Sequence, residues 1–89
     1  MDKIKGKVID IIDGDTFEIK VTLFEKENEF KYYNKERILI NEFDEQQLNT
    51  NFGERTKEKL EQLLIDKEVH VSINSRDKEG RIVGKIKII

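Results

Sequence analysis

The spacing of apolar residues along the chain predicts mostly β-strands. In residues 16–23 apolar and polar side chains alternate, so that Phe17, Ile19, Val21 and Leu23 would share one face and Thr16 would begin the other. Such alternation is typical of a strand that is buried on one face. Apolar runs and shorter alternations favour further strands at residues 6–12, 30–40, 69–73 and 82–89.

One segment has helical rather than strand periodicity. Residues 53–65 carry Leu60, Leu63 and Leu64 at the spacing of one helix face, and Glu54 lies where a negative charge favours the start of a helix. The order β-β-β-α-β-β suits a mainly β fold with one α-helix, a five-stranded OB-like β-barrel with the helix between strands 3 and 4. Periodicity predicts these elements but does not by itself show that the strands close into a barrel.

Length and composition indicate a small single domain and exclude functions that need cysteine. The length of 89 residues suits a single domain. Charged residues make up 40% of the chain and apolar residues 36%, which predicts a thin core under a densely charged surface. The net charge of −2 argues against a strongly cationic nucleic-acid binder, although the 17 lysines and arginines leave room for a local basic patch. The absence of cysteine excludes disulfides, zinc–thiolate sites and a thiol nucleophile.

The N-terminus and the apolar runs bear on location. The first residues enter a strand pattern without the apolar stretch of a signal peptide, and no apolar run approaches membrane-spanning length. We therefore expect a soluble chain. The sequence leaves its location open, including whether a leader was removed from a longer precursor.

Three short motifs carry the candidate chemistry. Residues 12–16 read Ile-Asp-Gly-Asp-Thr, residues 36–45 begin with a Glu-Arg pair and end in an acidic cluster, and residues 77–81 read Asp-Lys-Glu-Gly-Arg. Carboxylates suit a hard cation, and guanidinium groups match the oxygens of a phosphate. Each motif also has an ordinary interpretation, as a tight turn, a solvated loop or a surface ion pair. One motif alone would therefore decide nothing.

Taken together, in this order and with a helix pattern in the gap, the motifs resemble those of the staphylococcal nuclease (thermonuclease) family. The resemblance covers nearly the whole chain, so it implies one SNase-like, OB-fold domain over residues 1–89. It also implies a Ca²⁺ site in which Asp15 and Glu42 supply carboxylates and Phe43 supplies its backbone carbonyl. Such hard oxygen ligands are those that Ca²⁺ prefers.

The same resemblance implies the catalytic residues. Arg37 and Arg81 would bind the phosphate, and Glu45 would orient or deprotonate the attacking water. The expected reaction is Ca²⁺-dependent hydrolysis of phosphodiester bonds in DNA or RNA, with a single-stranded or frayed nucleic acid as the substrate or ligand.

Some positions depart from the family pattern. Glu42 stands where aspartate is usual, and Phe43-Asp44 replaces a Thr-Pro or Ala-Pro pair, so we expect weak Ca²⁺ binding by a longer ligand in a less constrained loop. Glu79 stands where the family often has an aromatic residue that stacks on a nucleotide. The family's C-terminal helices are lacking after residue 89, which predicts barrel surface that another domain or a partner could cover.

Two hypotheses stay open at this point. The first is an active phosphodiesterase, favoured by the completeness of the Arg37, Glu45 and Arg81 set. The alternative is a catalytically weak or inactive SNase-like module that binds nucleic acid or a protein partner, favoured by the acidic net charge and the departures at Phe43 and Glu79.

Overall fold

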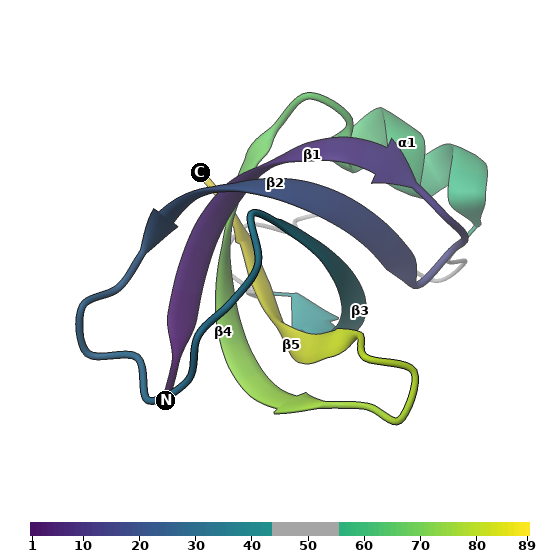
Figure 1. Ribbon diagram of the computed structural model, residues 1–89. Coiled ribbons are helices and arrows are strands. Elements are labelled where there is room, and N and C mark those ends of the chain that lie inside the picture. Colours follow the sequence, from purple (N-terminus) through teal and green to yellow (C-terminus); the bar gives the residue numbers. More distant parts are fainter. Residues whose placement is uncertain (44–55) are drawn as a thin grey trace.

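The computed structural model describes residues 1–43 and 56–89 and shows a closed β-barrel (Figure 1). Its elements are β1 (Lys3–Ile11), β2 (Thr16–Phe24), β3 (Lys35–Phe43), α1 (Lys57–Leu64), β4 (Glu68–Arg76) and β5 (Ile82–Ile88). The strands follow the order β1-β2-β3-β5-β4 around the barrel, and pairing of β1 with β4 closes it. The predicted fold class, a mainly β, five-stranded OB-like barrel with its helix between strands 3 and 4, is confirmed.

The pairing of β3 with β5 differs from the others because these two strands run parallel. Ile38 lies opposite Ile82 and Ile40 opposite Gly84, whereas the remaining neighbours among the described strands are antiparallel. Parallel neighbours need a long crossover connection. In this chain the crossover contains α1 and β4.

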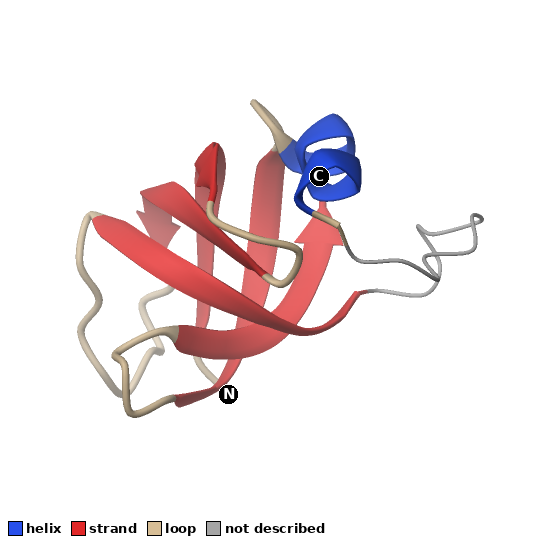
Figure 2. Ribbon diagram, turned by 90° about the vertical axis from the view of Figure 1, so that its right-hand side faces the viewer, coloured by secondary structure: helices blue, strands red, loops and turns tan. Residues whose placement is uncertain are grey.

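Apolar side chains from every strand fill the barrel, and α1 adds two more. The fully buried members of this core include Ile4, Val8, Phe17, Ile19, Ile38, Leu60, Leu64, Val69, Val71, Ile82 and Ile86. The helix begins after Thr56, whose Oγ1 accepts a hydrogen bond from the Lys59 amide at 3.2 Å. It lies across one end of the barrel (Figure 2). Residues 53–55 of the predicted helix lie outside the described residues, and the helix ends at Leu64, one residue earlier than predicted.

No helix among the residues that the structure describes combines the length and apolar character needed to cross a membrane.

The prediction that the third strand begins at residue 30 is wrong. The strand begins at Lys35, because backbone amides of the preceding residues donate to side-chain carboxylates instead of to a neighbouring strand. Asp2 accepts from the amides of Glu29 and Phe30 at 2.9 and 3.1 Å. Glu36 accepts from the Tyr33 amide at 2.9 Å. Residues 30–34 therefore form an irregular segment in which the amides of Phe30 and Tyr33 donate to side-chain carboxylates rather than to a neighbouring strand.

The expected faces of β2 are wrong at its two ends. Leu23 is exposed because the pairing with β1 shifts register between Lys5 and Gly6, so Leu23 lies opposite Lys5 and turns outward. Thr16 is buried, although simple alternation assigned it to the polar face. Side-chain period alone predicts neither change, since a one-residue slip reverses the two faces of a strand.

Close approach of strands predicts a packing constraint at Gly84. A Cβ added there would lie 2.6 Å from the backbone oxygen of Ser72 and 3.0 Å from a Val71 methyl carbon. We expect Gly84→Ala to lower the free energy of unfolding by about 1–3 kcal/mol, the usual cost of overpacking. Urea denaturation would measure this change, with Lys87→Ala on the exposed side of β5 as the control. Equal stability of the two variants would contradict the constraint.

Candidate functional site

The turn between β1 and β2 is organised by Asp13 and presents Asp15. One Asp13 oxygen accepts hydrogen bonds from the amides of Asp15 and Thr16, at 2.8 and 2.9 Å. Asp15 is exposed, and its carbonyl accepts from the Ile40 amide of β3 at 2.8 Å. The ordinary interpretation of this motif as a turn therefore describes Asp13, while Asp15 lies at the surface beside β3.

Glu42 and Phe43 lie near the end of β3, just beyond Ile40. The pairing with β5 shifts register between Ile40 and Glu42, which turns the Glu42 side chain outward, where it is 58% exposed. One Glu42 oxygen lies 4.0 Å from Nζ of Lys85, its register partner on β5. Phe43 packs its ring into the core, which holds the end of the strand in place.

The predicted acidic cluster is only partly within the described residues. Asp15 and Glu42 are described, whereas Asp44 and the predicted water-activating residue Glu45 fall in residues 44–55, outside them. Among the described residues, no group of three or more histidine, cysteine, aspartate or glutamate side chains is arranged to hold a metal ion.

Arg37 lies on the outer face of β3. Its side chain is 52% exposed, and Nη2 lies 3.7 Å from a carboxylate oxygen of Glu18, the cross-strand partner on β2. An exposed pair at this distance contributes little to stability. Arg37 in β3 and Arg81, the last residue before β5, each precede one member of the inward-facing pair Ile38 and Ile82. Both arginines are therefore expected on the outer side of the barrel, where β3 and the start of β5 are neighbours.

Arg81 is held more firmly than Arg37, and Asp77 is the reason. One Asp77 oxygen accepts from Nε of Arg81 at 2.8 Å, and the other accepts from the amides of Arg81 and Glu79 at 2.8 and 3.0 Å. The Gly80 amide donates to the Asp77 carbonyl, and Gly80 itself has a φ of 84°, a value that favours glycine. Burial opposes ionisation of Asp77, but the hydrogen bonds from Arg81 outweigh it and lower the pKa of the carboxyl.

Two other groups contact the Arg81 guanidinium. Nη1 donates to Oγ1 of Thr16 at 3.3 Å, and this contact links the β4–β5 turn to the β1–β2 turn. Nη2 lies 3.3 Å from a carboxylate oxygen of Glu79, whose side chain is mostly exposed. Any phosphate that binds Arg81 would therefore meet the negative charge of Glu79.

An ion pair between the buried carboxylate of Glu36 and the partly exposed guanidinium of Arg76 lies next to this region. Glu36, only 4% exposed, accepts hydrogen bonds from Nη1 and Nη2 of Arg76, both at 3.0 Å. Nη1 of Arg76 also donates to the Gly80 carbonyl at 2.6 Å. Because Glu36 precedes Arg37 and Gly80 precedes Arg81, Arg76 joins the two chain segments that carry the arginine pair.

The motifs in the sequence included Asp77 and Glu36 but gave them no role, and Arg76 was not singled out. For Asp77 a signal was available, since aspartate at the first position and glycine at the fourth position of a four-residue segment favour a turn. For Glu36 and Arg76 there was none, because the two residues are 40 positions apart and pair only in the folded barrel.

The ion pair of Glu36 with Arg76 generates a stability prediction. Arg76→Met would leave the buried Glu36 carboxylate without its guanidinium, and we expect the free energy of unfolding to fall by about 1–3 kcal/mol. The double variant Glu36→Leu/Arg76→Met should recover much of the loss, because apolar side chains can replace a buried ion pair. Thermal or urea unfolding of the single and double variants tests this, and a double variant less stable than the single one would refute it.

The contact of Glu79 with Arg81 generates a binding prediction. Glu79→Gln keeps the shape of the side chain but removes the competing charge, so a nucleoside 5′-phosphate should bind about two- to fivefold more tightly. Calorimetric titration would measure the change in Kd. Glu27→Gln, an exposed acid on the β2–β3 connection, changes the net charge equally and is the control. The same gain in both variants would mean that overall charge, rather than the Arg81 contact, sets the affinity.

Comparison with known proteins identifies the family. A family model described as staphylococcal nuclease homologue matches residues 25–89, a stretch that contains Arg37, Glu42, Glu45 and Arg81 but not Asp15. Comparisons with curated proteins and with solved structures gave no match. Because the match covers well over half of the chain, the chain belongs to the staphylococcal nuclease homologue family, and this membership indicates a nuclease-related or nucleic-acid-binding function.

Proposed function

We propose that this chain is a Ca²⁺-dependent nuclease that hydrolyses phosphodiester bonds in DNA or RNA. The observation that carries the proposal is the position of Arg37 and Arg81 just before the paired residues Ile38 and Ile82 of the parallel strands β3 and β5, with the backbone carbonyl of Asp15 hydrogen-bonded to β3. Phosphoryl transfer depends largely on positioning and on opposing the negative charge of the transition state, and both need such groups on one face.

The arginine pair would bind the phosphate and stabilise the transition state. A guanidinium presents a planar fork of N–H donors that matches two phosphate oxygens. Asp77 and Thr16 fix the orientation of Arg81 before any substrate arrives, so little reorganisation would be needed during the reaction. Arg37 is held less tightly and would adjust to the bound phosphate.

The oxygen groups of Asp15, Glu42 and Phe43 fit a hard cation in type. Carboxylates and a backbone carbonyl are ligands that Ca²⁺ accepts, and the ion tolerates irregular coordination. When bound, Ca²⁺ would supply positive charge to a phosphate oxygen. Lys85, 4.0 Å from Glu42, competes with a cation for that carboxylate, which together with the length of Glu42 supports weak binding.

Glu45 is the proposed group that orients or deprotonates the attacking water. It follows Glu42 by three residues along the chain. A general base acts only within hydrogen-bond reach of the proton that it removes.

A second candidate is a weak or inactive module that binds single-stranded or frayed nucleic acid, or a protein partner. The contacts of Arg81 with Asp77 and Glu79 favour this second candidate, because the two carboxylates already oppose much of the positive charge of the guanidinium. A further domain or partner covering the outer barrel surface belongs to this proposal as well.

A nuclease assay on single-stranded DNA and RNA, with Ca²⁺ and then with a chelator, tests the first candidate. Arg37→Ala or Arg81→Ala should lower the rate by roughly a hundred- to a thousandfold, because each removes a donor aimed at transition-state charge. Arg81→Lys should also be damaging, since an ammonium cannot make the two-pronged contact. Glu45→Gln should remove the base while keeping its shape.

The control is Lys87→Ala, which removes an exposed cation from β5 without touching the arginine pair. Full activity in the arginine and Glu45 variants would refute the catalytic assignment. Binding of nucleic acid or protein by a wild type that never cleaves would favour the second candidate.

A further inference from the structure

A cavity of about 630 Å³ is lined in part by Met1 and Asp2. The N-terminus lies at the end of the barrel away from α1 (Figures 1 and 2). The lining of the cavity comes from the N-terminal residues, the irregular segment before β3, the end of β4 and Ile82. None of the residues proposed for phosphate, metal or water lines it. A volume of this size is typical of sites that enclose a small molecule or one unit of a polymer.

Flat and apolar surfaces form the walls of the cavity. Ile73 and Ile82 belong to the barrel core and line its inner part, while Phe30, 69% exposed, lines it from the surface. The Tyr32 ring carries the Arg76 guanidinium above it, with Cζ 5.7 Å from the ring centroid. An aromatic ring and a guanidinium plane are the surfaces on which nucleobases stack.

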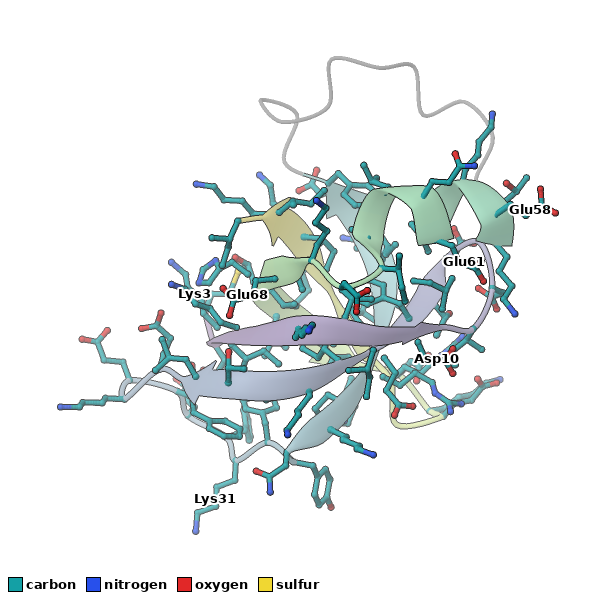
Figure 3. The ribbon with its side chains drawn as sticks, turned by 90° about the horizontal axis from the view of Figure 1, so that it is seen from above. Lys3, Asp10, Lys31, Glu58, Glu61 and Glu68 are labelled. Atoms are coloured by element: carbon teal, nitrogen blue, oxygen red, sulfur yellow. The ribbon has the colours of Figure 1, made fainter. Side chains whose placement is uncertain are left out.

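Two of the charged residues that line the cavity, Asp2 and Arg76, have partners in the protein, and Glu29 and Lys31 contribute to its lining as well. The Asp2 carboxylate accepts from the Tyr32 hydroxyl at 2.6 Å and from the amides of Glu29 and Phe30, and these hydrogen bonds lower its pKa. Arg76 is paired with Glu36. The Lys31 side chain points away from the barrel (Figure 3).

The aromatic and guanidinium surfaces of the cavity fit a flat ligand with hydrogen-bonding groups at its edge. Asn74 and Ser75, residues with an amide and a hydroxyl, are also among those that line it. Stacking surfaces combined with a few polar groups characterise recognition of single-stranded nucleic acid. A nucleobase has this chemistry.

We propose that the cavity binds a nucleobase of the strand whose phosphate contacts Arg37 and Arg81. The proposal rests on the nucleic-acid binding argued above, but not on hydrolysis. Arg76 connects the cavity with the arginine pair. It lines the cavity and pairs with Glu36, which precedes Arg37 in the chain. It also donates to the carbonyl of Gly80, which precedes Arg81. A strand bound this way must be single or frayed, since a paired base cannot enter a cavity.

The two exposed aromatic residues of the irregular segment provide a matched test. Phe30 lines the cavity and Tyr33 does not, although Tyr33 is the more exposed at 75%. Affinity for a fluorescent single-stranded oligonucleotide would be measured by anisotropy, with a chelator present to prevent cleavage. We expect Phe30→Ala to weaken binding at least about fivefold, the low end for loss of one stacked base. Tyr33→Ala should change the affinity less than twofold, and Phe30→Tyr, which keeps a ring, should match wild type.

Two further measurements locate the bound base. In NMR titrations with thymidine or adenosine, which lack phosphate, the amides of Tyr32, Asn74 and Ser75 should shift. An oligonucleotide with abasic sites should bind wild type and Phe30→Ala equally. Unfolding midpoints of the variants would confirm that the fold is intact.

The proposal is overturned if millimolar nucleoside leaves the cavity amides unchanged, or if Phe30→Ala and Tyr33→Ala bind the oligonucleotide alike. If Arg81→Ala still weakens oligonucleotide binding in that case, the proposed nucleic-acid function survives without the cavity. If the wild type binds no oligonucleotide at all, both proposals fail. If nucleosides shift the cavity amides but nothing is cleaved, the cavity proposal stands and hydrolysis does not.

Discussion

The parallel pairing of β3 with β5 is the constraint on which the rest of the structure depends. It completes the barrel between strands that are separated in sequence by α1 and β4, and it sets Ile38 against Ile82. Once these two side chains enter the core, the residues before them must turn outward, because successive side chains in a strand point to opposite faces. The geometry of the arginine pair is thus a consequence of core packing. A shift in the register of β3 against β5 would move Arg37 and Arg81 apart even if both residues were kept.

The two turns next to the arginine pair are built in the same way. In each turn the carboxylate of one aspartate accepts hydrogen bonds from backbone amides. Asp13 does so in the β1–β2 turn and Asp77 in the β4–β5 turn. Each then presents another residue, Asp15 in the first turn and Arg81 in the second. Because the carboxylates of Asp13 and Asp77 accept hydrogen bonds from amides of their own turns, we assign them a structural role.

Side-chain period was sufficient to predict the strands, the helix and their order, because each buries apolar residues at its own spacing. It failed where a side chain replaced a backbone partner or a bulge changed the register. Side-chain carboxylates accept from amides near Tyr33, so β3 begins later than predicted, and a register shift turns Leu23 outward. The motif residues were recognisable because they are local in sequence. The Glu36–Arg76 pair and the cavity beside it were not, since they depend on segments that meet only in the closed barrel.

The balance of charge around the arginine pair decides what kind of nucleic-acid contact this surface can make. Asp77 binds Arg81 through Nε and also holds two amides, so a phosphate would not displace it, whereas Glu79 makes one exposed contact that a phosphate could replace. With Glu18 beside Arg37, the pair offers a positioned but weakly attractive site. Phosphate contacts by exposed groups weaken as the salt concentration rises. Stacking of a base depends less on salt, so the proposed stacking in the cavity would help a chain with net negative charge to retain a strand on its arginines.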